Sequence, residues 1–312
     1  MPWSQRGVVY QTDGTRSWSR THTQLPTAIE LDGILRVYYG TRDENNRSRT
    51  SFVELDPLDP ARILREHDEP VLGLGRPGCH DEDGAIVSHV IRSGDDLLMY
   101  YGGVSRGGSV PYRMSIGLAR SRDGGLSFQR EFEGPVVDRT PLEPFMTMAP
   151  YVRRQESHWI MWYGSGVGWI QIGSKYEPTY IVKAASSSDG IHWQQSNHTC
   201  IHPLQPQEAN TRPSVLATNE GYEMWFSYRD SHDYRDGAGS YRIGYAVSAD
   251  GLNWDRKVDA VGLEPTGAGW NSAAMSYPNV IVSNGKKIMF HNGDGFGRTG
   301  FGYSVWSPEP TV

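Results

Sequence analysis

The stretch Met161-Trp162-Tyr163-Gly164 is one copy of a pattern that recurs along the whole chain. In each copy an apolar residue precedes an aromatic residue that begins the core of a predicted β-strand. The other copies are Val37-Tyr38-Tyr39-Gly40, Met99-Tyr100-Tyr101-Gly102, Met224-Trp225-Phe226-Ser227 and Met289-Phe290-His291-Asn292. Successive copies lie 62 to 65 residues apart, so five units account for all 312 residues. A fixed period of this kind indicates a repeat architecture.

Two further sequence markers recur at the same spacing as the aromatic cores. In four units a proline lies 12 residues before the first aromatic, at Pro26, Pro150, Pro213 and Pro278. Proline suits the first residue of a strand, because its missing N–H breaks no ladder bond. After the cores, Asp-Gly pairs that begin at residues 123, 189 and 250 predict tight hairpins, since glycine accepts positive φ. Each unit is therefore predicted to be a four-stranded antiparallel meander, and such units arranged radially make a β-propeller.

The last unit stops early, because no Asp-Gly hairpin follows the strand predicted at residues 300–305. A matching segment stands at the other end of the chain, at residues 12–18. We therefore predict an all-β fold: a five-bladed β-propeller with four antiparallel strands per blade, closed by the N-terminal strand. One domain would span residues 1–312. Its blades would lie at about 19–72, 73–140, 141–203, 204–262, and 263–312 with 7–18.

Composition excludes several classes of protein. Aromatic residues make up 11% of the chain, which disordered proteins lack, and the net charge of −6 argues against a nucleic-acid partner. No apolar run is long enough to span a membrane, and the first residues lack an apolar signal core. Cys79 and Cys200 do not make a disulfide framework. We expect a cytoplasmic protein with a small-molecule or glycan substrate, no membrane partner and no cofactor; its oligomeric state is open.

A ligand site is expected where the innermost strands begin, because these strands line the central channel of a propeller. Polar side chains are abundant in the segments that precede them, at residues 20–24, 79–84, 207–212 and 269–277. The alternative is that these are ordinary polar loops. Arg212, next to Pro213, would offer paired donors to a carboxylate or phosphate. No histidines stand at metal-ligand spacing, so we predict no metal site.

The five-unit pattern, with its Asp-Gly-x-x-Trp hairpins, resembles the five-bladed propeller glycoside hydrolases. This group includes the arabinanase, invertase and mannoside-phosphorylase families, and the chain looks closest to glycosidase-like propellers of bacterial surface-sugar clusters. The resemblance is carried by Thr41-Arg42-Asp43, Asp81-Glu82-Asp83-Gly84, Val110-Pro111-Tyr112-Arg113, Arg212-Pro213-Ser214-Val215 and Asn292-Gly293-Asp294-Gly295. It implies a propeller fold and sugar chemistry, although a fold alone does not fix a reaction.

Hydrolysis of a glycosidic bond needs two carboxyl groups. The resemblance implies one acid just before the first proline and another in a Glu-Ala-Pro triplet of the third unit. Here these positions read Gln24-Leu25-Pro26 and Met148-Ala149-Pro150, without an acid. Acids remain in other segments that precede inner strands, and of these we predict Glu208 and Asp83 as the catalytic pair, although a solvated loop carboxylate or a turn cap is the alternative for each.

The predicted substrate-binding residues combine cations, hydroxyl-binding groups and an aromatic wall. They are Arg42, Asp43, Asp81, Arg113, Arg212, Arg229, Trp270, Asn271, Tyr277, His291, Asn292 and Asp294. Where an arginine stands beside an aspartate, we expect a structural ion pair in at least half of the cases. For Tyr277 a place in the hydrophobic core is an equal alternative.

The leading hypothesis is a carbohydrate-active enzyme of the glycoside-hydrolase propeller type. It would act on a small, anionic sugar or glycan terminus at the channel mouth, where four arginines are expected: Arg42, Arg113, Arg212 and Arg229. The missing acids at Gln24 and Met148 leave two alternatives open. One is a non-catalytic sugar-binding propeller, and the other is a non-hydrolytic sugar enzyme such as a phosphorylase, transferase or lyase.

Overall fold

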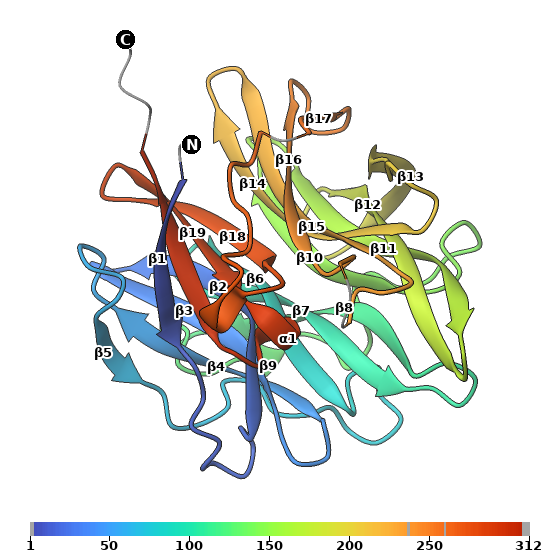
Figure 1. Ribbon diagram of the computed structural model, residues 1–312. Coiled ribbons are helices and arrows are strands. Elements are labelled where there is room, and N and C mark those ends of the chain that lie inside the picture. Colours follow the sequence, from blue (N-terminus) through green and yellow to red (C-terminus); the bar gives the residue numbers. More distant parts are fainter. Residues whose placement is uncertain (1–2, 236–237, 259, 308–312) are drawn as a thin grey trace.

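The computed structural model describes residues 3–235, 238–258 and 260–307, and nearly all of their regular structure is β-strand (Figure 1). The strands form five sheet units, numbered here in chain order. Unit one holds β2 (Thr21–Leu31), β3 (Ile34–Arg42), β4 (Ser48–Leu55) and β5 (Ile63–Glu66). Unit two holds β6 (Gly84–Ser93), β7 (Asp96–Arg106), β8 (Tyr112–Ser121) and β9 (Gln129–Arg130). Unit three holds β10 (Thr147–Arg154), β11 (Trp159–Ile172), β12 (Lys175–Ser187) and β13 (Gln194–Ile201).

The last two units complete the chain. Unit four holds β14 (Glu208–Thr218), β15 (Gly221–Asp230), β16 (Arg242–Ser248) and β17 (Asp255–Arg256). Unit five holds β18 (Ser276–Ser283), β19 (Lys286–Asn292), β20 (Phe301–Trp306) and β1 (Trp3–Tyr10). A 3-10 turn (Gly269–Asn271) and the four-residue α1 (Asp294–Gly297) lie in connections. Neither helix in the described part of the chain is long and apolar enough to cross a membrane.

Within each unit, neighbouring strands pair in antiparallel fashion, as the repeat predicts. Units one and two are joined into one eight-stranded sheet by a single parallel contact between Ser48 and Gly84. In unit five the first strand of the chain pairs with the last, with Trp3 opposite Trp306. The strand that pairs here, β1, lies earlier in the chain than residues 12–18, where we predicted the matching segment. The reason is that the turn around Asp13 follows β1 and does not precede it. Residues 308–312 of the predicted fifth blade lie outside the described residues.

Adjacent aromatic residues in each core explain why the pattern specifies the fold. Consecutive side chains of a strand point to opposite faces of the sheet. Tyr38 therefore packs with Val87 of unit two, whereas Tyr39 packs with Phe290 of unit five. Both tyrosines are completely buried. The aromatic pairs of units two, three and four divide between two neighbouring clusters in the same way, and in unit five Met289 and Phe290 do so. Figure 1 shows the units following one another around the molecule, from blue through teal and yellow-green to gold and red.

The first strands of the units lie at the centre of this arrangement. Each contacts the first strand of the next unit, and β18 contacts β2. The pairing of every first strand with its neighbour is interrupted by a register shift near its middle. In four units the residue before the proline has a positive φ of 49 to 57°: Leu25, Ala149, Arg212 and Tyr277. A positive φ is strained for such residues, and a bulge of this kind re-aims side chains.

Candidate functional site

A cavity of about 340 Å³ opens at these bulges and is lined by residues from all five units. The first strands contribute eight residues: Gln24, Leu25, Ile86, Ser88, Met148, Ala149, Thr211 and Tyr277. Other strands and loops contribute all of the charged side chains and most of the aromatic ones, together with polar and apolar residues; they include Arg42, Asn46, Ser48, Asp83, Arg106, Tyr112, Met114, Tyr180, Arg229, Tyr234, Arg235, Tyr241 and Phe296. The repeated backbone feature therefore gathers residues that are far apart in sequence around one space.

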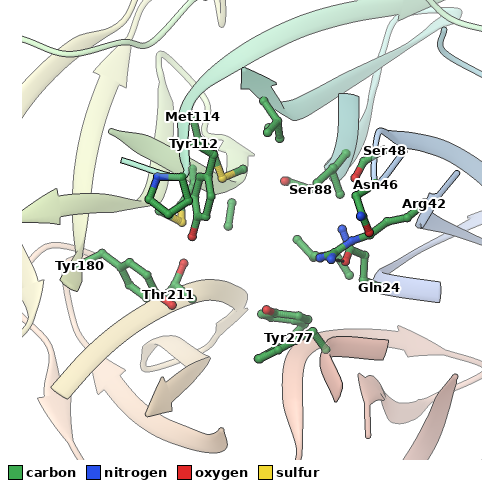
Figure 2. Close-up of a pocket in the computed structure, with 18 of the residues that line it drawn as sticks. Gln24, Arg42, Asn46, Ser48, Ser88, Tyr112, Met114, Tyr180, Thr211 and Tyr277 are labelled. Atoms are coloured by element: carbon green, nitrogen blue, oxygen red, sulfur yellow. Dashed lines mark hydrogen bonds between the residues drawn. The ribbon is translucent and has the colours of Figure 1, made fainter. Parts of the chain in front are cut away.

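The cavity has two chemically different walls. Figure 2 shows Gln24, Arg42 and Asn46 on one side and Tyr112 and Tyr180 on the other. The first wall offers hydrogen-bond donors and acceptors, and the second offers aromatic rings. A small ligand with one apolar face and a polar edge, such as a sugar ring, suits this division.

Arg42, at the end of β3, is the cation of the polar wall. Its Nη2 donates a hydrogen bond to Gln24 Oε1 at 3.0 Å. Among the described residues no carboxylate lies within ion-pair distance of Arg42. Burial lowers the pKa of Arg42, and the neighbouring charges of Arg298 and Arg235 act in the same direction. The structure therefore holds an arginine whose charge is not compensated by an acid.

Asp83 is the one carboxylate among the described residues that line the cavity. It accepts a hydrogen bond from the backbone N–H of Arg106 at 2.8 Å, and the Arg106 Nε lies 3.6 Å from its other oxygen. The other predicted catalytic residue, Glu208, begins β14 but does not line the cavity. It is buried and forms an ion pair with Arg256. The structure thus does not bring the predicted catalytic pair together in this cavity.

Gln24 and Met148 both line the cavity. These are the two positions at which the family resemblance implies an acid, so the positions face the site but carry an amide and a thioether. The described lining therefore offers one carboxylate where glycoside hydrolysis requires two.

Arg229 supports the aromatic wall. Each of its three nitrogens donates to the protein: Nε to the hydroxyls of Tyr180 and Tyr241 at 3.0 and 3.2 Å, Nη1 to Ser231 Oγ, and Nη2 to the Pro178 carbonyl. Its guanidinium also lies 3.7 Å from the centre of the Tyr234 ring. Arg229 is almost completely buried. Its contacts are therefore those of a side chain that holds tyrosines in place.

Arg235 is paired with an acid next to the cavity. Its Nε lies 2.7 Å from Glu177 Oε1, and its Nη2 donates to Glu177 Oε2 at 2.9 Å. This bidentate contact compensates the charge of Arg235. Tyr234 also donates to Glu177, which fixes the segment that carries both residues.

Arg212 lies behind the cavity and does not line it. Its guanidinium donates to the carbonyl of Ser88, to the carbonyl of Pro26 at 3.1 Å and to Thr27 Oγ1 at 2.9 Å. Burial lowers the pKa of Arg212 to about 10. We expected Arg212 at the mouth of the channel, but its side chain instead links the first strands of neighbouring units.

Three of the predicted binding acids are engaged by other residues of the protein. Asp43 bonds Arg47 and Arg49, and Asp81 bonds Arg130 at 2.7 Å and the Tyr101 hydroxyl at 3.0 Å. Burial opposes ionisation of Asp43, but hydrogen bonds from Arg47 and Arg49 outweigh it and hold its pKa below the usual range. Asp294 accepts hydrogen bonds from Ser272, Ala273 and Ala274. None of these three carboxylates lines the cavity.

The remaining predicted residues also lie outside the lining. Trp270 stacks on His291, which is completely buried. Asn271 donates to Gln5 Oε1. Asn292 links the backbone of Thr23, Leu25 and Gly300 through its amide. Arg113 is exposed. Of the fourteen predicted site residues, the cavity lining includes Asp83, Arg42, Arg229 and Tyr277.

Sequence analysis missed most of the aromatic wall. Tyr180 and Tyr241 stand in segments that look like ordinary strand sequence, and nothing local separates them from core tyrosines. The residue directly before each proline did carry a usable signal. Leu25, Ala149 and Tyr277 occupy this same position in their units, and all three line the cavity. Reading these positions as a set would have found part of the cavity.

Comparison with known proteins places the chain among relatives of the same length. No protein-family model matches the chain. The uncharacterized protein Rv1502 of Mycobacterium tuberculosis (strain ATCC 25618 / H37Rv) is 34% identical over 307 residues, which cover 98% of this chain and 99% of that protein. The uncharacterized protein MT1551 of the CDC 1551 / Oshkosh strain matches with the same identity and coverage.

Solved structures with a similar fold are glycoside hydrolase-like. The BT0996 RGII complex has a TM-score of 0.72 at 15% identity, and the match covers 98% of this protein and 92% of that one. A thermostable family-43 glycoside hydrolase has a TM-score of 0.65 at 16% identity, with 95% and 90% covered. A structure from the GH130 family of mannoside phosphorylases, with glycoside hydrolases that target β-1,2 mannosidic linkages in Candida mannan, has a TM-score of 0.69 at 14% identity, with 99% and 96% covered.

At these identities the structural neighbours establish the fold and leave the reaction undetermined. They support the glycosidase-like fold that the sequence resemblance implies. Together with the full-length match to the mycobacterial proteins, they show that this chain belongs to the family of Rv1502 and MT1551 and has a glycoside hydrolase-like propeller fold.

Proposed function

We propose that this protein is a carbohydrate-active propeller protein that takes a small sugar or a glycan terminus in the cavity. The observation that carries this proposal is the two-walled cavity, in which Gln24, Arg42 and Asn46 face Tyr112 and Tyr180. Aromatic rings stack on the apolar face of a sugar, and the opposite wall serves its hydroxyls. The neighbours support this choice of ligand, since one of them is the BT0996 RGII complex.

The ring geometry belongs to the same proposal. We propose that residues 1–312 form one domain, a closed five-bladed propeller. The contact of β18 with β2 and the pairing of β1 with β20 support closure, because both join the end of the chain to its beginning. We also propose that the protein lies closest to the glycosidase-like propellers of surface-sugar clusters. The cytoplasmic location, and the absence of nucleic-acid and membrane partners, stay predictions.

The chemistry that fits the lining uses one carboxylate. We propose that Asp83 transfers the proton in any reaction at this site, because it is the carboxylate of the described lining. A glycoside hydrolase would need a second acid, and Glu208 is bound to Arg256 away from the cavity. A non-hydrolytic reaction that uses one acid and one anion site fits Asp83 with Arg42. A sugar-binding protein without catalysis is the second candidate, favoured by the amide and thioether at Gln24 and Met148.

The test is calorimetric titration with a panel of neutral and acidic mono- and disaccharides, followed by product analysis after long incubation. Binding of at least one sugar is expected. Turnover that Asp83→Asn abolishes, and that Glu208→Gln leaves in place, would support an enzyme that uses Asp83. Turnover that depends on added phosphate would identify the phosphorylase alternative, and binding without product would identify the binding protein. Failure to bind any sugar in the panel would overturn the proposal.

A further inference from the structure

We propose that the sugar bound in this cavity carries a carboxylate or phosphate group, and that Arg42 binds this anion. The inference rests on the proposed sugar site and deepens it by naming the substrate class. The sequence suggested an anionic ligand from four arginines, of which the structure places only Arg42 and Arg229 in the cavity lining.

The first step of the argument is the charge balance of the lining, which includes four arginines and one carboxylate. Arg235 is paired with Glu177, and Arg106 lies beside Asp83. Arg229 has every nitrogen engaged by protein oxygens. Arg42 is the lining arginine that has neither an acidic partner nor a full set of acceptors in the described structure.

The second step is the state of the Arg42 guanidinium. Within the described residues its one hydrogen bond runs from Nη2 to Gln24, which leaves Nε and Nη1 without a protein acceptor. Neither nitrogen is among the buried polar atoms that lack a partner, so a ligand in the cavity can reach both. Nη2 carries two hydrogens and donates only one of them to Gln24. Its second hydrogen and that of the neighbouring free nitrogen on the same edge of the planar guanidinium can donate side by side to the two oxygens of a carboxylate or phosphate. The arginine therefore presents an open fork to the cavity.

The third step is the identity of its neighbour. Gln24 Oε1 accepts the hydrogen bond as a carboxylate oxygen would, but an amide does not neutralise the guanidinium. A partly buried charge is costly unless an opposite charge accompanies it. The polar wall thus carries one uncompensated positive charge, and a ligand that supplies a negative charge gains more from Arg42 than a neutral ligand does.

The fourth step is the place of the anion relative to the sugar ring. Arg42 lies opposite Ser48 in the pairing of β3 with β4, and Asn46 belongs to the connection between them. These polar side chains surround the anion position, whereas Tyr112 and Tyr180 lie across the cavity (Figure 2). One ligand can therefore place its anion on Arg42 and its ring against the tyrosines. Asp83 would not compete for Arg42, because its contacts go to Arg106.

The sharpest variant is Gln24→Glu. It keeps the size and shape of the side chain, leaves Arg42 in place, and sets a carboxylate where the amide oxygen now accepts its hydrogen bond. We would titrate the wild-type protein and this variant with glucose, glucuronate, glucose 6-phosphate and inorganic phosphate, and repeat the titrations with the galactose and mannose counterparts. Gln24→Glu is expected to weaken binding of the acidic sugars by about tenfold or more and to weaken binding of the neutral sugars less, so that the preference for acidic sugars is lost.

Two further variants keep the result interpretable. Arg42→Gln removes the charge and is expected to give the same loss, and Arg42→Lys keeps the charge without the fork and is expected to lie between. Arg122→Gln is the matched control, because it removes one positive charge at an exposed site after β8 and should leave all affinities unchanged. Thermal unfolding of each variant shows whether it is folded, and Gln24→Glu keeps the test valid if the Arg42 variants unfold.

The outcomes separate this inference from the proposed function. Preference for acidic sugars that Gln24→Glu removes supports it. Equal binding of neutral and acidic sugars, unaffected by Gln24→Glu, overturns the anion site and leaves the sugar site standing. Binding of inorganic phosphate alone, with no preference for acidic sugars, also overturns it, because the anion would then be a separate reactant. Absence of binding by every sugar overturns the proposed function itself.

Discussion

Arg212 donates a hydrogen bond from Nη2 to the carbonyl oxygen of Pro26 at 3.1 Å, although 186 residues separate them in sequence. The same guanidinium bonds the carbonyl of Ser88. One side chain of β14 in unit four thereby links the first strands of units one and two. Its own backbone has a φ of 53°, a strained value that the surrounding contacts maintain.

Replacement of Arg212 by Met should destabilise the protein by about 3 kcal/mol or more, because it leaves buried carbonyl and hydroxyl groups without donors. The free energy of unfolding can be measured by chemical denaturation. Arg122→Met is the control, since Arg122 is exposed. A loss no larger than that of the control would show that the cross-link does not stabilise the centre of the fold.

Glu208→Ala should lower stability without lowering sugar affinity. Glu208 and Arg256 form a buried ion pair outside the cavity, and loss of one partner of such a pair costs about 3–5 kcal/mol. The affinity of the best sugar ligand should stay within about twofold of the wild type, as expected for a site that the change does not touch. Calorimetry on the folded variant checks this. A large loss of sugar affinity would show that Glu208 does take part in binding.

Gly117→Ala should destabilise the interface between units one and two. A Cβ at Gly117 would lie 2.2 Å from Cζ of Tyr101, whose ring covers this strand, so the ring would have to move. Overpacking of this kind costs about 1–3 kcal/mol. Gly134→Ala is the matched control, because nothing lies within 4 Å of a Cβ at that position. Equal thermal midpoints for the two variants would contradict the packing argument.

The protein should lose stability between neutral and mildly acidic pH. Burial lowers the pKa of His291 from 6.5 to about 4, and burial with the charge of Arg212 lowers that of His89 to about 3. Below pH 6.5 the unfolded chain binds protons that the folded chain excludes, so unfolding becomes easier as the pH falls toward 4. The histidine contribution is complete above pH 6.5 and is lost on the acid side.

Unfolding midpoints measured between pH 7 and pH 4.5 test this pH dependence. His291→Gln should flatten the curve, since it removes one of the titrating groups. His192→Gln is the matched control and should leave the curve unchanged, because the His192 side chain is largely exposed. If the His291→Gln curve keeps the slope of the wild type, the buried histidine is not a source of the acid sensitivity.

The strand framework was predictable because its signals are local and repeat. The pair Tyr38-Tyr39 fills two cores through the alternation of a single strand, and Asp189 and Asp250 accept backbone hydrogen bonds within their own hairpins. Pattern and neighbours along the chain decide such features. Repetition at a constant spacing then assigned strands in all five units without knowledge of the tertiary structure.

The site was less predictable, because long-range contacts decide which polar residues remain available. Arg42 and Arg113 look alike in sequence, yet one faces the cavity and the other is exposed. Arg229 meets Tyr180, 49 residues away, and Glu208 meets Arg256, 48 residues away. Composition and spacing identify charged residues near inner strands, whereas only the fold shows which of them already have partners.

The hydrogen bonds of Arg212 to the carbonyls of Ser88 and Pro26 bear on how a ligand would enter and leave the cavity. We expect this buried guanidinium, which ties first strands together, to close the cavity at its inner end, so that a ligand would depart through the opening by which it arrived. An unbranched polymer would then be able to insert only its tip. Each departing molecule would then have to clear the entrance before the next one docks.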